Sequence, residues 1–246
     1  MKKLLFLLCM IPFALWSQEN EPPIMHVMEF TVKEGHQMKF MDGLKEWKEC
    51  YKSNGGNTSY TVWNRMMGEG SVVALTFNSP NWAALDDNDE PKVSENCDPL
   101  AFEKLMPHVE KSNRLIARVA PEWSRSNPSD GMVAMVTFFK VDDYQTFTST
   151  VEEVTKTMRE KEGDVRGNWF RLMGGKDAPD YMVSRIYENF AGMDVKEDGV
   201  WKMYGSAKGD SKMKEMRDKF SSSVKDSWTN LYRVNEELSY QANDSQ

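Results

Sequence analysis

Two short stretches carry the residue types best suited to holding a small ligand. Residues 63–68 and 169–174 both follow a Trp-x-Arg-(Met/Leu)-Met-Gly pattern, 106 residues apart. Alternate residues of a β-strand share one face, so the tryptophan and the arginine of each stretch would point the same way. An indole ring beside a guanidinium suits a planar or carboxylate-bearing ligand. The candidate ligand-binding residues are therefore Trp63, Arg65, Trp169 and Arg171.

The same residues have a structural interpretation. Tryptophan and methionine stripes usually fill a core, and an arginine paired with an acidic residue can reach an edge. The repetition fits both interpretations, because duplication of a segment copies structural and functional residues alike. The side of the sheet that Trp63 and Trp169 face decides between them.

Histidine, a common ligand of metal ions, occurs only as His26, His36 and His108. None of them has a second histidine four residues away, so the sequence predicts no zinc site. The acidic run from Asp86 to Glu90 lacks the glycine and the terminal glutamate of an EF-hand loop, which favours a solvated loop. We therefore assign no metal ligands.

The N-terminus predicts export. Lys2 and Lys3 precede an apolar run from Leu4 to Trp16, the pattern of a secretory signal peptide. We expect residues 1–17 to be removed and the mature protein to be periplasmic or secreted.

Export bears on the cysteines, since only Cys50 and Cys97 would remain after cleavage. In an oxidising compartment they can form a disulfide, provided that their Cα atoms come within reach. The sequence does not show that distance, and two unpaired thiols fit it equally well.

Composition narrows the classes of partner. A net charge of -7 and an isoelectric point near 5.2 argue against binding to nucleic acid or to anionic membranes. Hydrophobic residues make up 40% of the chain and aromatic residues 11%, enough to build a core. We expect a folded protein whose partner is a small molecule.

The expected strands and helices occur in the same order twice along the chain, and the first copy contains the Trp-x-Arg stretch at 63–68. It contains an expected strand at 24–32, a helix at 37–51, a hairpin of strands at 60–67 and 71–77, a loop at 86–99, a helix at 102–116 and an edge strand at 117–124 interrupted by Pro121.

The second copy begins with an expected strand at 132–141. In its first helix, four apolar residues lie 107 positions after four apolar residues of the first copy: Phe147, Val151, Val154 and Met158 follow Phe40, Leu44, Trp47 and Tyr51. A hairpin at 168–175 and 180–187, a polar insertion at 192–212, a helix at 213–231 and a strand at 232–239 complete the copy. The predicted domains are a first repeat over 18–124, a linker at 125–131, a second repeat over 132–240 and a polar tail at 241–246.

Each copy thus has the βαββαβ order of a ferredoxin-like domain. Its two helices would cover one face of an antiparallel sheet and leave the other face needing a partner, which the second copy supplies. The predicted fold class is α+β, with two ferredoxin-like repeats whose sheets pack as an intramolecular barrel.

At this level the chain resembles the dimeric α+β barrel superfamily, which includes antibiotic-biosynthesis-type and haem-degrading monooxygenases. The resemblance covers Met25 to Tyr240 in element order and loop lengths, and it includes the strand ending Phe30-Thr31-Val32-Lys33-Glu34-Gly35 directly before a helix. It implies a barrel normally made from two chains. Because haem enzymes of the superfamily supply an axial histidine from a helix, it also makes His108 the haem candidate. The superfamily's catalytic asparagine, tryptophan and histidine have no residue-by-residue match here.

Three functions follow as hypotheses. The first is an exported binding protein that holds a small apolar or aromatic molecule between the sheets, requires no cofactor, and is a monomer with an internal pseudo-dimer or a weak homo-oligomer. The second, which rests on the resemblance, is a monooxygenase-like enzyme that is cofactor-independent or uses haem. The third is an interaction protein without a pocket.

Overall fold

The computed structural model describes residues 22–86, 90–127 and 130–242. The predicted signal peptide therefore lies outside the described residues. The first half comprises β1 (Ile24–Val32), α1 (Gln37–Ser53), β2 (Tyr60–Arg65), β3 (Ser71–Ser79), η1 (Ala83–Leu85), α2 (Pro91–Lys104), η2 (Met106–His108) and β4 (Val109–Val119). The second half comprises β5 (Val133–Val141), α3 (Tyr144–Glu162), β6 (Asn168–Met173), β7 (Tyr181–Tyr187), η3 (Phe190–Asp194), α4 (Val200–Lys208), α5 (Asp210–Ser223) and β8 (Val224–Val234).

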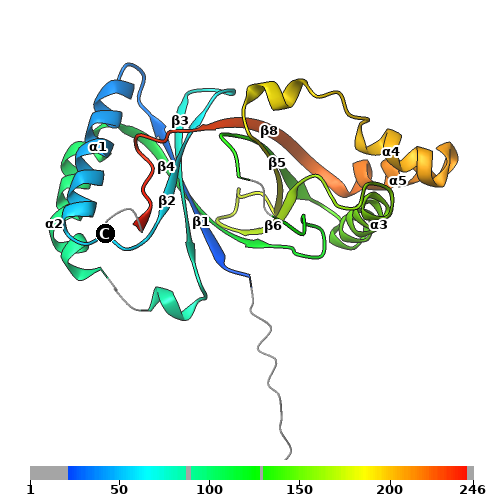
Figure 1. Ribbon diagram of the computed structural model, residues 1–246, viewed down its shortest axis with the longest axis horizontal. Helices are drawn as coiled ribbons and strands as arrows, with labels where there is room; N and C mark the ends of the chain where they lie inside the picture. Colours follow the sequence, from blue (N-terminus) through cyan, green and yellow to red (C-terminus); the bar gives the residue numbers. More distant parts are fainter. Residues whose placement is uncertain (1–21, 87–89, 128–129, 243–246) are drawn as a thin grey trace, which may run out of the picture.

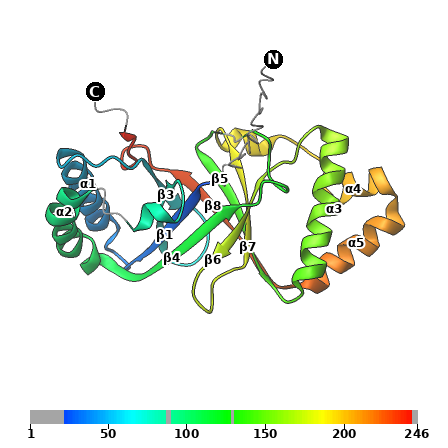
Figure 2. The ribbon, with the colours of Figure 1, turned by 90° about the horizontal axis from the view of Figure 1, so that it is seen from below.

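The strands form one closed antiparallel barrel in the order β1-β3-β2-β8-β5-β7-β6-β4. Each half supplies four neighbouring strands, and the halves join where β2 pairs with β8 and β4 with β6. Helices α1 and α2 lie on one side of the barrel and α3, α4 and α5 on the opposite side (Figures 1 and 2). The predicted α+β barrel of two ferredoxin-like repeats is confirmed, and its closure leaves no unpaired sheet edge.

Strand alternation separates an interior from two helix-covered outer faces. On β5, Ala134 and Val136 belong to the core cluster inside the barrel, whereas Phe139 packs against Phe147 of α3. Both faces of this strand are therefore covered, which explains its nearly continuous apolar sequence.

The predicted boundaries between the last helix and the last strand of each half are wrong. Helix α2 ends at Lys104 and α5 at Ser223, so Ile116 and Leu231, assigned above to helical stripes, lie in β4 and β8. Each strand begins with a valine, and the polar, mostly exposed residues that follow it show no hydrophobic alternation. Without a period of two, the sequence pattern did not mark where these strands begin.

Two further predictions are corrected near these strands. The predicted loop at 86–99 is helical from Pro91 onward, because proline fits the first turn of a helix, where its missing N–H has no partner to lose. Pro99 inside α2 concealed the helix from sequence reasoning. The expected strand segments at 122–124 and 237–239 are turns and irregular structure.

A disulfide joins the two helices of the first half. Cys50 on α1 and Cys97 on α2 are bonded, with their Cα atoms 5.8 Å apart. Of the two states that the sequence allowed, the structure has the paired one.

The N-terminus of α3 provides a testable contribution to stability. The Asp143 carboxylate accepts a hydrogen bond from the Thr146 backbone N–H at 3.0 Å, and bonds to the Thr146 hydroxyl and backbone hold the Asp143 pKa below its usual value. A carboxyl whose pKa is lowered by folding stabilises the protein above its unfolded pKa, and this contribution is lost as the pH falls through the folded value. We expect Asp143→Ala to lower the melting temperature at neutral pH.

The deficit should shrink as the pH falls below about 4, measured by circular dichroism. Asp142→Ala removes the same charge from the neighbouring exposed position and is the control. An Asp143→Ala deficit that does not change with pH would contradict the capping role.

Candidate functional site: two cavities on opposite faces of the barrel wall

The two Trp-x-Arg stretches face opposite sides of the sheet. Trp63 lies inside the barrel, where its indole N–H donates to Thr76 Oγ1 at 3.0 Å. Trp169 lies on the outer face beneath α3, stacked on Phe139 with ring centroids 5.6 Å apart. The ligand-binding interpretation required each stretch to line the space between the sheets, and Trp169 and Arg171 do not meet this condition.

The reason is a shift of one residue. The first strand and first helix of the two copies correspond at a spacing of 107, whereas the Trp-x-Arg stretches recur at 106. Because side chains alternate with a period of two, a slip of one residue moves the whole stretch to the other face. In β6 the inward positions belong instead to Asn168 and Phe170.

Arg171 has a structural role on the outer face. Its guanidinium forms an ion pair with Glu122 and lies 5.1 Å from the centroid of the Trp123 ring. The segment after β4 is thereby tied to β6, as the structural interpretation of this arginine expected.

A cavity of about 230 Å³ lies inside the barrel, between the sheets of the two halves. Its wall is mainly apolar and includes Trp63, Ala74, Ala134, Phe170 and Met182. It therefore has the composition of a site for a small apolar or aromatic molecule.

A second, polar chamber of about 360 Å³ adjoins it, and Glu29 and Phe138 line both. Arg65 lines this polar chamber, but its guanidinium is turned toward the β2–β3 hairpin and donates to the Glu69 carbonyl. Gly68 in that hairpin has φ 108°, and a Cβ there would approach the Arg65 guanidinium to 3.3 Å. The glycine of the repeated pattern thus lets the arginine fold back on its own turn.

Sequence reasoning missed an acidic group inside the barrel. The Tyr232 hydroxyl donates to Glu29 Oε1 at 3.0 Å and accepts a hydrogen bond from the Asn230 side-chain amide at 3.1 Å. Burial and the negative charge of Glu29 raise the pKa of Tyr232, so the phenol stays protonated at neutral pH. Glu29 shares its strand face with Met25 and Val27, and this alternation was the signal that could have revealed it.

The outer face of the second half carries another cavity, of about 310 Å³, between the sheet and the helices. Trp169, Phe139, Met158, Val154, Trp201 and Phe220 line it. Trp169 is therefore packed on one side and borders a cavity on the other.

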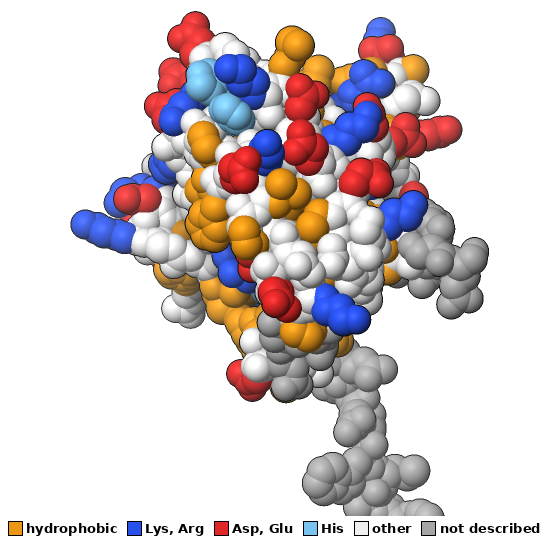
Figure 3. All heavy atoms as spheres, turned by 90° about the vertical axis from the view of Figure 1, so that its left-hand side faces the viewer, with side chains coloured by type: hydrophobic (Ala, Val, Ile, Leu, Met, Phe, Trp, Pro, Cys, Tyr) orange, Lys and Arg blue, Asp and Glu red, His pale blue; other side chains and the backbone are white. Residues whose placement is uncertain are grey.

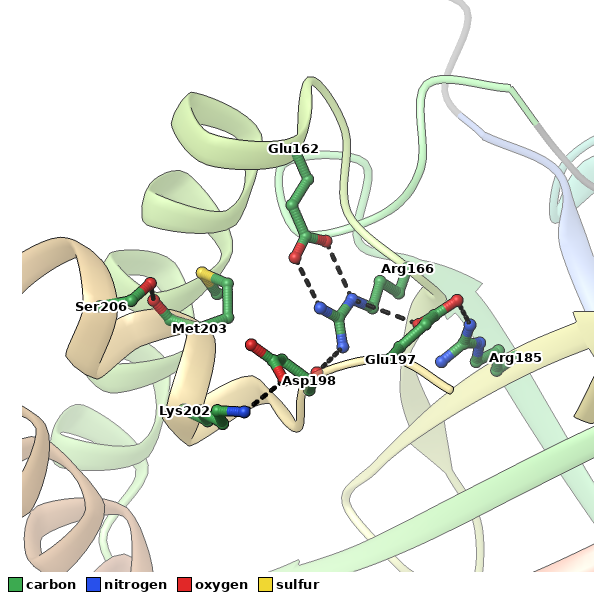
Figure 4. Close-up of polar contacts among 8 residues, drawn as sticks. All are labelled: Glu162, Arg166, Arg185, Glu197, Asp198, Lys202, Met203 and Ser206. Atoms are coloured by element: carbon green, nitrogen blue, oxygen red, sulfur yellow. Dashed lines mark hydrogen bonds and ion pairs between the residues drawn. The ribbon is translucent and has the colours of Figure 1, made fainter. Parts of the chain in front are cut away.

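Charged contacts hold the rim of this outer cavity (Figure 4). Arg166 bonds Glu162 through two nitrogens, at 2.5 and 2.9 Å, and donates to the Asp198 carbonyl at 2.6 Å. Arg185 bonds Glu197 at 2.7 Å, and this contact lowers the pKa of Glu197. The segment leading into α4 is thereby tied to α3 and to β7.

We expect Arg166→Met to lower the free energy of unfolding by about 1–2 kcal/mol, because it breaks several charge-assisted bonds of a side chain that is only 18% exposed. Lys202→Met is the control. The Lys202–Asp198 pair is largely exposed, and such pairs contribute about 0–1 kcal/mol. Urea unfolding of the two variants measures the difference, and equal losses would contradict the role of Arg166 at the rim.

His108 lies outside all of these cavities. Its Nδ1 is 3.0 Å from Nδ1 of His36. Figure 3 shows histidine side chains next to a basic side chain on the face of the molecule that α1 and α2 cover. Partial desolvation, followed by the positive charges of His36, Lys39 and Lys33, lowers the pKa of His108.

The third histidine, His26, is fully buried and contacts Ser79 Oγ at 3.0 Å and the Phe77 ring. Burial, followed by the charge of Arg114, lowers its pKa. The second half of the chain contains no histidine. The positions of the three histidines therefore do not fit a haem bound through an axial histidine in either cavity.

No family model matches the chain, and no curated protein matches it by sequence. Solved structures do match it. An anthrone oxidase-like protein aligns at a TM-score of 0.56 with 10% identity, over 92% of this chain and 96% of its own. A provisionally assigned monooxygenase from Lactobacillus acidophilus aligns at 0.52 with 14% identity, over 87% and 94%. Chlorite dismutase from Candidatus Nitrospira defluvii, in complex with imidazole, aligns at 0.52 with 11% identity, over 89% and 94%.

The chain has the dimeric α+β barrel fold. At these identities the similarity concerns the fold alone, and chemistry has to be argued from the residues present.

Two features are absent from the described ranges. No cluster of three or more histidine, cysteine, aspartate or glutamate side chains gathers there as a metal site. None of the helices in these ranges combines the length and the apolar composition that crossing a membrane requires.

Proposed function

We propose that this is an exported protein that binds a small apolar or aromatic molecule inside its barrel. The observation that carries the proposal is the position of Trp63 on the wall of the cavity of about 230 Å³, which both halves line. An apolar cavity that also presents a few polar groups is the usual form of a small-molecule site.

Two features support export, and a third supports a monomeric state. Residues 1–17 have the pattern of a signal peptide, and the Cys50–Cys97 disulfide suits an oxidising compartment. The chain closes its barrel without a second copy, so we expect a monomer with an internal pseudo-dimer.

A calorimetric titration of the mature protein with phenethyl alcohol tests the binding site. We expect Trp63→Ala to weaken binding by about five- to thirtyfold, since one well-buried aromatic contact contributes about 1–2 kcal/mol. Trp82→Ala removes an indole that is 42% exposed outside the barrel and should leave the affinity unchanged.

Ala134→Leu narrows the cavity without removing the tryptophan and should also weaken binding. Unchanged affinity in both Trp63→Ala and Ala134→Leu would overturn the proposed site. A mass-spectrometric search for molecules that co-purify with the native protein would then identify the natural ligand.

A second candidate function is a cofactor-independent, monooxygenase-like enzyme. The outer cavity of about 310 Å³ beside Trp169 favours it, as does the fold shared with an anthrone oxidase-like protein. Oxygen consumption with a phenolic substrate, abolished by filling the cavity with Val154→Phe, would support this function. If no phenol that binds the protein causes oxygen uptake, the monooxygenase-like function is excluded.

A further inference from the structure

The cavity inside the barrel is lined by one acidic side chain, Glu29, which has no salt-bridge partner among the residues that the structure describes. Glu29 lies where the apolar cavity meets the polar chamber. Within the described residues its carboxylate forms no salt bridge, and the hydrogen bond from Tyr232 is its polar contact there. Glu29 is half-buried at this junction, so a ligand in the apolar cavity can reach its carboxylate and form a charge-assisted bond there.

The surroundings of Glu29 leave it free to act as an acceptor. Arg65 lines the polar chamber together with Glu29, but its guanidinium donates to the Glu69 carbonyl. The Asn230 amide donates to the Tyr232 hydroxyl, which directs the tyrosine proton toward Glu29 and leaves the second carboxylate oxygen available. Glu29 is the charged side chain on the wall of the apolar cavity, whereas the cations Arg65, Lys111 and Lys176 line the polar chamber beyond it. An occupant of the apolar cavity therefore meets a negative charge where the two chambers join.

Aromatic rings surround the same region. Trp63 and Phe170 line the apolar cavity, and Phe138, which borders both chambers, stacks on Trp228 with ring centroids 5.4 Å apart. Aromatic faces favour cations as well as apolar groups. A carboxylate within aromatic walls therefore has the chemistry of a site for an organic cation.

Resting on the proposed function, we propose that the ligand of the barrel cavity is a primary amine with an apolar or aromatic body, whose ammonium group binds Glu29. The body occupies the apolar cavity beside Trp63, and the ammonium group donates to the free oxygen of Glu29. A neutral ligand would lack this charge-assisted bond, and an anionic ligand would be repelled.

Three probes with the same phenyl body separate these cases: phenethylamine, phenethyl alcohol and phenylacetate. In calorimetric titrations of the mature protein at neutral pH, we expect the amine to bind at least about tenfold more tightly than the alcohol, and phenylacetate to bind most weakly. In Glu29→Gln, which keeps the size of the side chain, the affinity for the amine should fall to that for the alcohol. The affinity for the alcohol should change less than about threefold, because its apolar contacts remain.

Glu69→Gln controls for the general attraction of cations to a protein of net charge -7. It removes one negative charge from an exposed hairpin position and should preserve the preference for the amine. Equal affinity for amine and alcohol in the wild type would overturn this inference and leave the proposed function standing, as would a preference that survives in Glu29→Gln. Failure of all three probes to bind the wild type would overturn the proposed function as well.

Discussion

Removing the Cys50–Cys97 disulfide is expected to lower the free energy of unfolding by about 3–4 kcal/mol. The bond links residues 47 positions apart, and closing a loop of that length restricts the unfolded chain by about 4 kcal/mol in the chain-entropy model. It also joins α1 to α2, the two helices that cover the first half of the sheet (Figure 1). Since Cys97 is fully buried, losing its sulfur adds a packing cost.

Urea unfolding of the double variant Cys50→Ala/Cys97→Ala at neutral pH measures the effect. Reduced wild-type protein is the matched control, because it breaks the bond and keeps both sulfur atoms. The free energy of unfolding should fall by similar amounts in the two proteins, and the double variant should be slightly the less stable of them. If the free energy of unfolding falls by less than about 1 kcal/mol in both proteins, the disulfide does not stabilise the first half of the chain.

Phe147→Ala should be comparably destabilising, at about 3–5 kcal/mol. Phe147 is fully buried at the centre of the aromatic cluster between α3 and the sheet. Its ring contacts those of Phe139, Trp169, Tyr181 and Phe220 at centroid distances of 4.9–6.1 Å. Truncation would leave a void next to the outer cavity, and the rigid strands below could close it only in part.

Phe102→Ala is the control, because Phe102 is also helical but 71% exposed, and surface changes usually stay within about 0.5 kcal/mol. Equal losses in chemical denaturation would show that the aromatic cluster does not hold α3 on the sheet. A large loss in Phe147→Ala alone would also support a packing role for Trp169, which lies against the same ring.

The architecture could be predicted because the relevant patterns are periodic. Phe147 and its three helical partners repeat Phe40 and its partners in register, and the β5 segment reads as a strand from end to end. The starts of β4 and β8 could not be predicted, because exposed polar residues there interrupt the alternation. These boundaries depend on pairing with distant strands, which local sequence does not encode.

Sequence reasoning placed only half of the candidate ligand-binding residues on the interior face of the barrel. Trp63 and Arg65 face the barrel interior, as the ligand-binding interpretation required. Trp169 and Arg171 lie outside the barrel, because the Trp-x-Arg pattern repeats after 106 residues whereas the structural elements repeat after 107. Glu29 and Tyr232 come together from strands 203 residues apart. The alternation of Met25, Val27 and Glu29 indicates that Glu29 points inward, but only the closed barrel brings it into contact with Tyr232, and local sequence does not encode that contact.

The most direct test of a ligand site inside the barrel is a crystal structure of the mature protein with phenethylamine bound. The account predicts that the phenyl ring lies between Trp63 and Ala134 inside the barrel, with the ammonium nitrogen within hydrogen-bond distance of Glu29. A ligand found only in the outer cavity beside Trp169, with the barrel cavity unchanged, would contradict it.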